Sequence, residues 1–164
     1  MLFRSNCSDR WLHCALLTFM PVTIVDIREL RSAVSGLDFV HADPTSLRQF
    51  DDGSIESLWS LHAVEHFGLG RYGDPVDPQA PFKVMEAFAR VLAPGGSLYF
   101  SVPVGRERLV FNAHRIFAPS TIISALDGLK LLSFSATAWR SRSAGRSWRR
   151  CRTVGRAAAQ PAFA

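Results

Sequence analysis

The sequence predicts an α/β fold built on a mostly parallel sheet with helices on both faces. Two observations predict it. Short β-branched and apolar runs alternate with segments of helical periodicity, and a Pro-Gly-Gly stop separates the clearest helix from the strand after it. At 164 residues, the chain is long enough for one domain with its own core but short for a complete α/β enzyme.

The expected strands are apolar runs bounded by proline, glycine or charged residues. They span residues 22–27, 37–43, 55–61, 97–104 and 129–136. The clearest helix covers residues 81–92, where apolar side chains recur every three or four positions. Shorter helical pieces are expected over residues 44–50 and 119–126, because each begins at a proline.

Residues 58–75, LWSLHAVEHFGLGRYGDP, contain two known motifs that conflict. His62, Glu65 and His66 spell H-x-x-E-H, an arrangement that on a helix can bring two imidazoles to one zinc ion, with the glutamate activating water. The motif directly follows a strand and leaves room for barely two helical turns, and no third ligand is evident nearby. A zinc-dependent hydrolase is therefore only an alternative.

Gly68, Gly70 and Gly73 spell G-x-G-x-x-G, the dinucleotide-binding pattern. In that pattern the last glycine opens a helix, whereas here Asp-Pro-Val-Asp-Pro follows. We expect the glycines to form a flexible or tightly turned loop over a pocket, where positive φ angles are needed.

Polar side chains gather at the expected carboxyl ends of three strands. Asp26 ends the first, Asp43 follows the second, and His62 to His66 follow the third. In a parallel sheet these ends share one edge, where open α/β sheets bind ligands. The two carboxylates could accept hydrogen bonds from ribose hydroxyls and an adenine amine, or could simply cap the segments that follow.

Four stretches resemble class I S-adenosylmethionine-dependent methyltransferases, which have a Rossmann-like fold. They are VTIVDI, FVHAD, IESLWSLHAVEHF and ARVLAPGGSLYFSVPVG. The longer run LHAVEHFGLGRYGDP is similar to a poorly characterised bacterial and nematode branch of that superfamily. The resemblance covers roughly residues 11 to 135.

The resemblance implies S-adenosylmethionine as cofactor and a small-molecule or saccharide methyl acceptor. Asp26 would then hold the cofactor ribose and Asp43 the adenine amine. Leu61 and His62 would line the methionine side, with Glu65 and His66 facing the acceptor. His66 and His114 are the candidate bases, since imidazole titrates near neutral pH.

The N-terminal segment departs from this family. Its members begin with a strand and a glycine-rich loop, but Gly36 is the only glycine before Asp52. We therefore expect residues 1–21 to form an atypical N-terminal segment in which the first strand is missing or atypical. The alternatives to an active enzyme are a truncated and impaired copy, or a non-catalytic binding module.

Charge separates the C-terminal segment from the rest. The net charge is +5, yet residues 136–164 hold seven arginines and no acidic residue. We expect a methyltransferase-like domain over residues 22–135 and a basic, disordered tail over 136–164, for which nucleic-acid binding is unlikely. Three cysteines without a paired spacing, and no evident signal peptide or membrane span, favour the cytoplasm.

Overall fold

The computed structural model describes residues 2–3, 15–29, 33–71, 73–110, 113–139 and 150–159. Its strands are β1 (Leu2–Phe3), β2 (Val22–Asp26), β3 (Leu37–His41), β4 (Ile55–Leu61), β5 (Leu92–Val104), β6 (Arg108–Val110), β7 (His114–Ile116), β8 (Leu129–Trp139) and β9 (Arg150–Ala159). Its helices are the 3₁₀ turn η2 (Val64–His66), α2 (Ala80–Val91) and α3 (Pro119–Ala125). The predicted α/β class with a mostly parallel sheet is confirmed.

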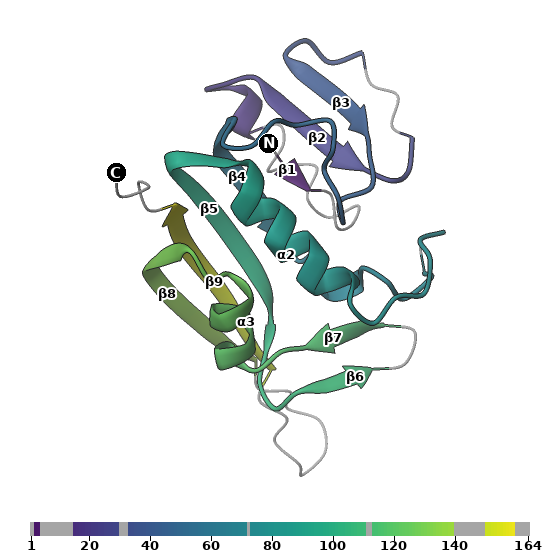
Figure 1. Ribbon diagram of the computed structural model, residues 1–164, viewed down its shortest axis with the longest axis vertical. Helices are drawn as coiled ribbons and strands as arrows, with labels where there is room; N and C mark the ends of the chain where they lie inside the picture. Colours follow the sequence, from purple (N-terminus) through teal and green to yellow (C-terminus); the bar gives the residue numbers. More distant parts are fainter. Residues whose placement is uncertain are drawn as a thin grey trace.

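One seven-stranded sheet organises the molecule, in the order β3-β2-β1-β4-β5-β9-β8 (Figure 1). The five strands from β3 to β5 run parallel. β9 runs antiparallel to both β5 and β8. The strand order reverses direction between β1 and β4, which is where open α/β sheets form their ligand crevice.

The first strand is atypical rather than missing. Leu2 pairs with Ile24 of β2 on one side and with Trp59 of β4 on the other. Phe3 continues both ladders, so β1 is a two-residue strand at the centre of the sheet. Of the two expected alternatives, a missing or an atypical first strand, the structure therefore shows the second. A run of two residues without a β-branched side chain lies below the length at which periodicity indicates a strand.

Most predicted elements lie within a few residues of their expected bounds. The strand expected over 97–104 is longer, because β5 begins at Leu92 and includes the Pro-Gly-Gly segment. Residues 44–50 form turns instead of a helix, and Leu47 there adopts a φ of 45°, which a right-handed helix does not allow. The β6–β7 hairpin lies in a stretch where the sequence predicted no strand.

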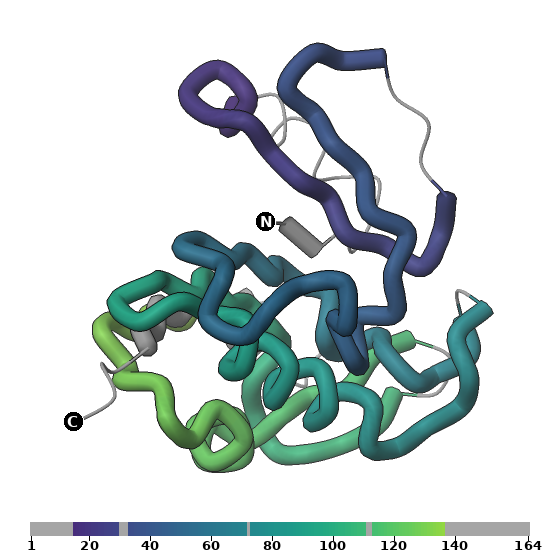
Figure 2. The backbone as a smooth tube through the Cα atoms, turned by 45° about the horizontal axis from the view of Figure 1, so that its top comes forward, coloured from purple at the N-terminus to yellow at the C-terminus, as the bar shows by residue number. Residues whose placement is uncertain are grey.

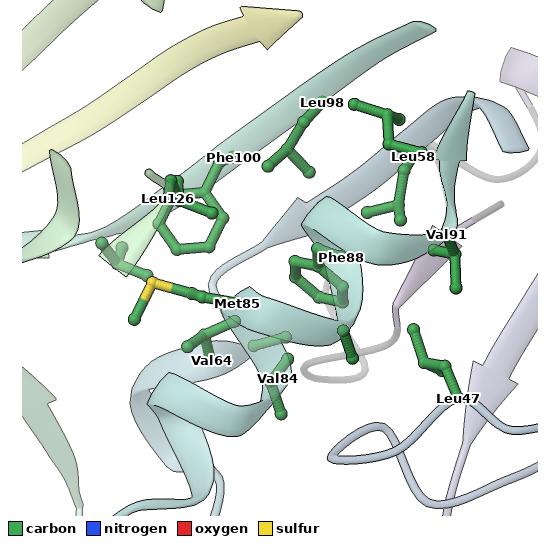
Figure 3. Close-up of a cluster of buried hydrophobic side chains, with 14 of the residues drawn as sticks. Leu47, Leu58, Val64, Val84, Met85, Phe88, Val91, Leu98, Phe100 and Leu126 are labelled. Carbon is green, nitrogen blue, oxygen red and sulfur yellow. The ribbon is translucent and has the colours of Figure 1, made fainter. Parts of the chain in front are cut away.

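The main core lies between α2 and the sheet. Val84, Met85, Phe88 and Val91 are fully buried on one face of α2 and meet β4 and β5 side chains such as Leu58 (Figure 3). These helical positions repeat at spacings of three and four residues, as the amphipathic pattern predicts. α3 covers the same face of the sheet farther along (Figure 1).

A smaller apolar cluster covers the opposite face. Val22 and Ile24 of β2 pack with Trp59 and with Leu16 and Leu17, which lie in a helical turn at residues 15–17. Neighbouring residues of a strand point to opposite faces, so Ile24 faces this cluster while Val25 faces the main core. Both faces of the sheet therefore carry helical segments.

The C-terminal segment contributes to the sheet. β8 extends to Trp139, and β9 pairs with β5 from Ser97 to Val104. Ten residues of the expected disordered tail, 150–159, thus form a strand, and β9 satisfies the hydrogen-bonding groups along the outer side of β5. Alternation of apolar side chains is absent from this segment, so sequence periodicity did not indicate it. Among the described residues, no helix is long and apolar enough to cross a membrane.

Candidate functional site

The predicted site residues lie at one edge of the sheet, beyond the carboxyl ends of parallel strands. β2 ends at Asp26, β3 is followed by Asp43, and β4 ends at Leu61, with His62 next. The segment between η2 and α2 and the β6–β7 hairpin lie beside each other at this edge (Figures 1 and 2). His66 joins the two, because its Nδ1 lies 2.7 Å from the carbonyl oxygen of Ala113.

Asp26 is buried and already has a cationic partner. The Arg28 guanidinium donates from Nη2 to Oδ2 at 2.7 Å and from Nε to Oδ1 at 3.0 Å. The backbone N–H of Arg28 donates to Oδ1 at 2.9 Å. Paired, hydrogen-bonded carboxylates are the kind that tolerate burial. The carboxylate predicted to hold a ribose therefore holds an arginine in this structure.

Asp43 faces a cavity of about 390 Å³ at the ends of β2 and β3. Its Oδ1 accepts hydrogen bonds from the backbone and side chain of Thr45, at 2.9 and 2.8 Å, so it also stabilises the turn after β3. Ile27 lines the same cavity together with Phe67, Asp74 and Lys83. A cavity lined by both an apolar side chain and an exposed carboxylate suits a flat ring that bears an amino group.

His62 and Glu65 interact directly. His62 Nδ1 lies 3.1 Å from Glu65 Oε1, and His62 Nε2 lies 2.9 Å from the Ser101 hydroxyl. Glu65 is 2% exposed, and its Oε2 has no hydrogen-bond partner among the described residues. His62 adopts a φ of 53°, uncommon for a residue with a side chain, while its N–H donates to the Ser101 carbonyl at 2.8 Å.

His66 and His114 meet edge to face, with ring centroids 6.4 Å apart and planes at 87°. Glu65 bonds to His62 rather than to this pair. Of the three candidate catalytic residues, the structure thus brings His66 and His114 together, whereas Glu65 contacts His62 instead.

The zinc interpretation of H-x-x-E-H has no support in this geometry. The motif spans a loop and the three-residue turn η2, so His62 and His66 do not share a helix face. They bond to different partners, Ser101 and Ala113. Within the part of the chain that the structure describes, no group of three or more His, Cys, Asp or Glu side chains could hold a metal ion.

The backbone of the glycine-rich segment binds Asp74, an acidic residue of the same segment. Gly68, Gly70 and Gly73 have φ angles of 70°, 68° and 84°, so of the two expected forms, flexible or tightly turned, the structure shows tight turns. The backbone N–H groups of Gly68, Leu69 and Gly70 all point to Asp74 Oδ2, at 2.6, 3.1 and 3.4 Å. Donors that could cradle a phosphate are thus occupied by a carboxylate of the loop itself.

Ion pairs surround this loop. Lys83 Nζ lies 2.7 Å from Asp77 Oδ2, and this contact holds the pKa of Asp77 below its usual range, helped by the backbone N–H of Gln79. Arg115 donates to the carbonyl of Phe67. Burial lowers the pKa of Arg115, while the nearby Asp74 and Asp77 raise it. The loop is therefore tied to both α2 and β7.

A second cavity, of about 310 Å³, lies on the hairpin side of Gly68. Most of its lining is apolar, with Phe82, Ile116 and Phe117 among the contributing side chains and Arg108 and Arg115 among the polar ones. Because Gly68 also lines the first cavity, the two cavities adjoin one segment of the chain. Asp43, one of the two predicted cofactor carboxylates, lines the first cavity, and residues of the β6–β7 hairpin line the second.

Comparison with known protein families matches residues 18–145 to the family described as "Caenorhabditis protein of unknown function, DUF268". The chain belongs to this family. No curated protein matches the sequence. The solved structures, in contrast, include many with the same fold.

Three solved structures illustrate the fold likeness of the DUF268 chain. A SAM-dependent methyltransferase from Methanosarcina mazei has a TM-score of 0.69 at 15% identity, covering 97% of this chain and 92% of that one. The 1,6-didemethyltoxoflavin-N1-methyltransferase of Burkholderia thailandensis, solved with 1,6-didemethyltoxoflavin and S-adenosylhomocysteine, scores 0.68 at 16% identity, covering 98% and 70%. The [4+2]-cyclase SpnF scores 0.70 at 15% identity, covering 97% and 74%.

These identities establish the fold alone. The DUF268 chain has the Rossmann-like fold of class I methyltransferases, as the sequence resemblance predicted. Two residues of the site were not predicted. Arg28 stands in a charged stretch after β2, and Ser101 lies in an apolar strand, where a serine gives no sign of a partner 39 positions away.

Proposed function

We propose that this protein is an S-adenosylmethionine-dependent methyltransferase acting on a small-molecule or saccharide acceptor. The observation that carries the proposal is the cavity of about 390 Å³ at the carboxyl ends of β2 and β3, which Ile27 and Asp43 line. It lies at the edge of the sheet where this strand order binds ligands. Fold likeness alone would not suffice, since one similar structure is a [4+2]-cyclase.

The residues at this edge fit the proposed cofactor. Asp43 would accept hydrogen bonds from the adenine amine, while Ile27 packs on the ring. Asp26 would accept from the ribose hydroxyls, sharing or exchanging its bonds with Arg28. Leu61 and His62, at the end of β4, would line the methionine portion. When bound, the cofactor supplies an electrophilic methyl group on a sulfonium.

The acceptor would occupy the hairpin side of the site. The cavity of about 310 Å³ there is large enough for a small molecule and is mostly apolar. His66 of η2 and His114 of β7 are the proposed acceptor-facing residues, and Arg115, which lines the cavity, would supply a positive charge. Positioning such an acceptor in line with the methyl group is the main requirement of the transfer.

A calorimetric titration with S-adenosylmethionine tests the proposal. We expect micromolar binding by the wild-type chain. Replacing Asp43→Ala removes a charged hydrogen-bond acceptor worth about 1.5–3 kcal/mol, which weakens binding by about 10- to 100-fold. Asp127→Ala is the matched control, because Asp127 lies in the turn after α3 and bonds only to the neighbouring Gly128 N–H among the described contacts.

Two results would contradict the proposal. A wild-type chain that binds neither S-adenosylmethionine nor S-adenosylhomocysteine would favour a non-catalytic binding module. Equal weakening by Asp43→Ala and Asp127→Ala would show that the ligand does not occupy the cavity at β2 and β3.

A further inference from the structure

Ser101, His62 and Glu65 form a continuous series of hydrogen bonds at the end of β4. The hydroxyl of Ser101 lies 2.9 Å from His62 Nε2, and His62 Nδ1 lies 3.1 Å from Glu65 Oε1. Ser101 belongs to β5 and Glu65 to η2, and both are 2% exposed. The His62 side chain is 34% exposed, so it is the one member of the series that a ligand can reach.

The partners fix which nitrogen of His62 carries its hydrogen. An ionised carboxylate only accepts hydrogen bonds, so Nδ1 must donate to Glu65. Nε2 of the neutral ring is then an acceptor, and the Ser101 hydroxyl donates to it. The lone pair of Nε2 is therefore available to an O–H group that takes the place of Ser101.

The protein maintains this arrangement against two local costs. The φ of 53° at His62 lies in the left-handed region, which costs a residue with a side chain about 1–3 kcal/mol. Glu65 is buried with Oε2 lacking a partner among the described residues, and such a group costs about 1–3 kcal/mol. Costs of this kind concentrate where a side chain must be held in one orientation for chemistry.

His62 also stands at the place where a ligand is expected. The strand order reverses between β1 and β4, and His62 is the first residue after β4. The crevice of an open α/β sheet lies outside the carboxyl ends of the strands at such a reversal. The partly exposed imidazole thus lies at the end of the sheet where such a crevice forms, while its carboxylate partner Glu65 is buried.

We propose that His62 Nε2 removes a proton from the methyl acceptor, that Glu65 is its positioning residue, and that the acceptor is therefore a hydroxyl compound. This inference rests on the proposed function. The acceptor oxygen forms a bond to the methyl carbon, the bond from carbon to sulfur breaks, and its electron pair stays on sulfur. The hydroxyl proton passes to Nε2, and Glu65 stabilises the resulting imidazolium through Nδ1–H.

Ser101 has a supporting role in this arrangement. A serine nucleophile would need an open path to its oxygen, but Ser101 of β5 is only 2% exposed. The Ser101 hydroxyl instead donates a hydrogen bond to His62 Nε2, and the acceptor hydroxyl takes over this bond when the acceptor binds. The hydrogen-bonded order resembles a catalytic triad, yet only the imidazole is reachable.

Nitrogen NMR of ¹⁵N-histidine-labelled protein tests the arrangement without any substrate. We expect neutral His62 to carry its hydrogen on Nδ1, and Glu65→Gln to abolish that preference while the other histidines keep their signals. The His62→Asn variant assigns the resonance, and asparagine tolerates the left-handed backbone at this position. A hydrogen on Nε2 in the wild type, or an unchanged preference in Glu65→Gln, would overturn the proposal.

Methyl transfer to two phenols tests the proton transfer itself. At about pH 8, phenol keeps its proton, since its pKa is close to that of tyrosine, at about 10, whereas 4-nitrophenol is largely ionised. With radiolabelled S-adenosylmethionine, His62→Asn should lower kcat/KM for phenol by about 10²- to 10⁴-fold. The loss on 4-nitrophenol should be at least tenfold smaller than on phenol, because no proton remains to be removed.

Two comparisons show which residue is the base and whether the cofactor binds at all: matched variants of the other histidines, and a measurement of cofactor binding. His66→Asn and His114→Asn should keep the wild-type ratio of the two phenols; a selective loss on phenol in either would move the base there and overturn the proposal. Equal losses on both phenols in His62→Asn, or no methylation of either by a chain that binds S-adenosylmethionine, would also overturn it. A chain that binds no cofactor contradicts the proposed function instead, and the NMR result alone then decides the role of Glu65.

Discussion

The Arg28 guanidinium lies against the buried Asp26 carboxylate, with Nη2 2.7 Å from Oδ2. The pair joins the last residue of β2 to the second residue beyond it, so a local turn closes the end of the strand. Ribose hydroxyls that approached Asp26 would meet a carboxylate whose two oxygens already accept three hydrogen bonds. If the proposed cofactor binds at Asp26, its ribose hydroxyls would compete with Arg28 for the carboxylate.

The Arg28→Ala substitution should lower the stability of the folded protein but raise its affinity for the cofactor. The variant leaves a buried carboxylate with only the backbone donor at residue 28, so we expect the free energy of unfolding to fall by about 1–3 kcal/mol in urea titrations. Affinity for S-adenosylmethionine should rise several-fold in calorimetry, because the competing guanidinium is gone. Arg48→Ala, which removes an exposed arginine, should change neither quantity. Weaker binding by Arg28→Ala would show that the arginine helps to hold the ligand.

Gly68 and Gly73 offer a matched comparison within the glycine-rich loop. A Cβ atom on Gly68 would lie 2.0 Å from the carbonyl oxygen of Asp77, whereas nothing lies within 4 Å of one on Gly73. Both have positive φ, so Gly73→Ala should cost about 1–2 kcal/mol from backbone strain alone. Gly68→Ala should cost about 2–5 kcal/mol, because the clash is added to the strain.

Thermal unfolding and amide hydrogen exchange would measure the two effects. Faster exchange at Leu69 and Gly70 in Gly68→Ala, but not in Gly73→Ala, would locate the damage at the N–H groups that Asp74 binds. Equal destabilisation by the two variants would mean that the loop can shift to accept a side chain at residue 68.

The sequence predicted those candidate site residues that lie at the carboxyl ends of strands. Asp26, Asp43 and His62 come directly after apolar runs, and parallel connections carry such positions to one edge of a sheet. Contacts that depend on tertiary packing were not predictable in this way. Ser101 meets His62 only because β4 and β5 pair in one register, with Leu61 opposite Ser101.

Two of the strands that the sequence did not predict, β1 and β9, were missed for different physical reasons. β1 consists only of Leu2 and Phe3, and a strand of two residues is too short to show the alternation of a strand in its sequence. Its position depends on pairing with β2 on one side and with β4 on the other. β9 has a small-residue and arginine-rich sequence with weak strand propensity, so its pairing with β5 outweighs local preference. Residues 44–50 show the reverse case, since the proline there begins turns and no helix.

Arg90 of α2 forms hydrogen bonds to the turns at residues 44–50, and we expect its replacement to lower the stability of the protein. Its guanidinium donates to the carbonyls of Ser46, Leu47 and Phe50 and pairs with Asp52. Arg90→Ala should lower the free energy of unfolding by about 1–3 kcal/mol, because each lost bond is worth about 1 kcal/mol and the side chain is partly exposed. Arg90→Lys should recover less than half of the loss, since an ammonium cannot reach several carbonyls at once. Full recovery in urea titrations would show that the charge pair with Asp52 accounts for the effect.

The contact between Asp77 and Lys83 predicts how stability depends on pH. Lys83 holds the pKa of Asp77 below its ordinary value of 3.8, so the folded state binds this proton less readily than the unfolded chain. The resulting stabilisation is present above the unfolded pKa and is lost as the pH falls through the lower, folded pKa.

Asp77→Asn keeps an oxygen for the Gln79 N–H but removes the charge. The variant should therefore unfold at a lower temperature than the wild type at neutral pH, with the difference closing below about pH 4. A Lys83→Met variant should abolish most of the effect of Asp77→Asn in a double-mutant cycle. A difference that persists undiminished at low pH would assign the effect to packing at the start of α2 rather than to the ion pair.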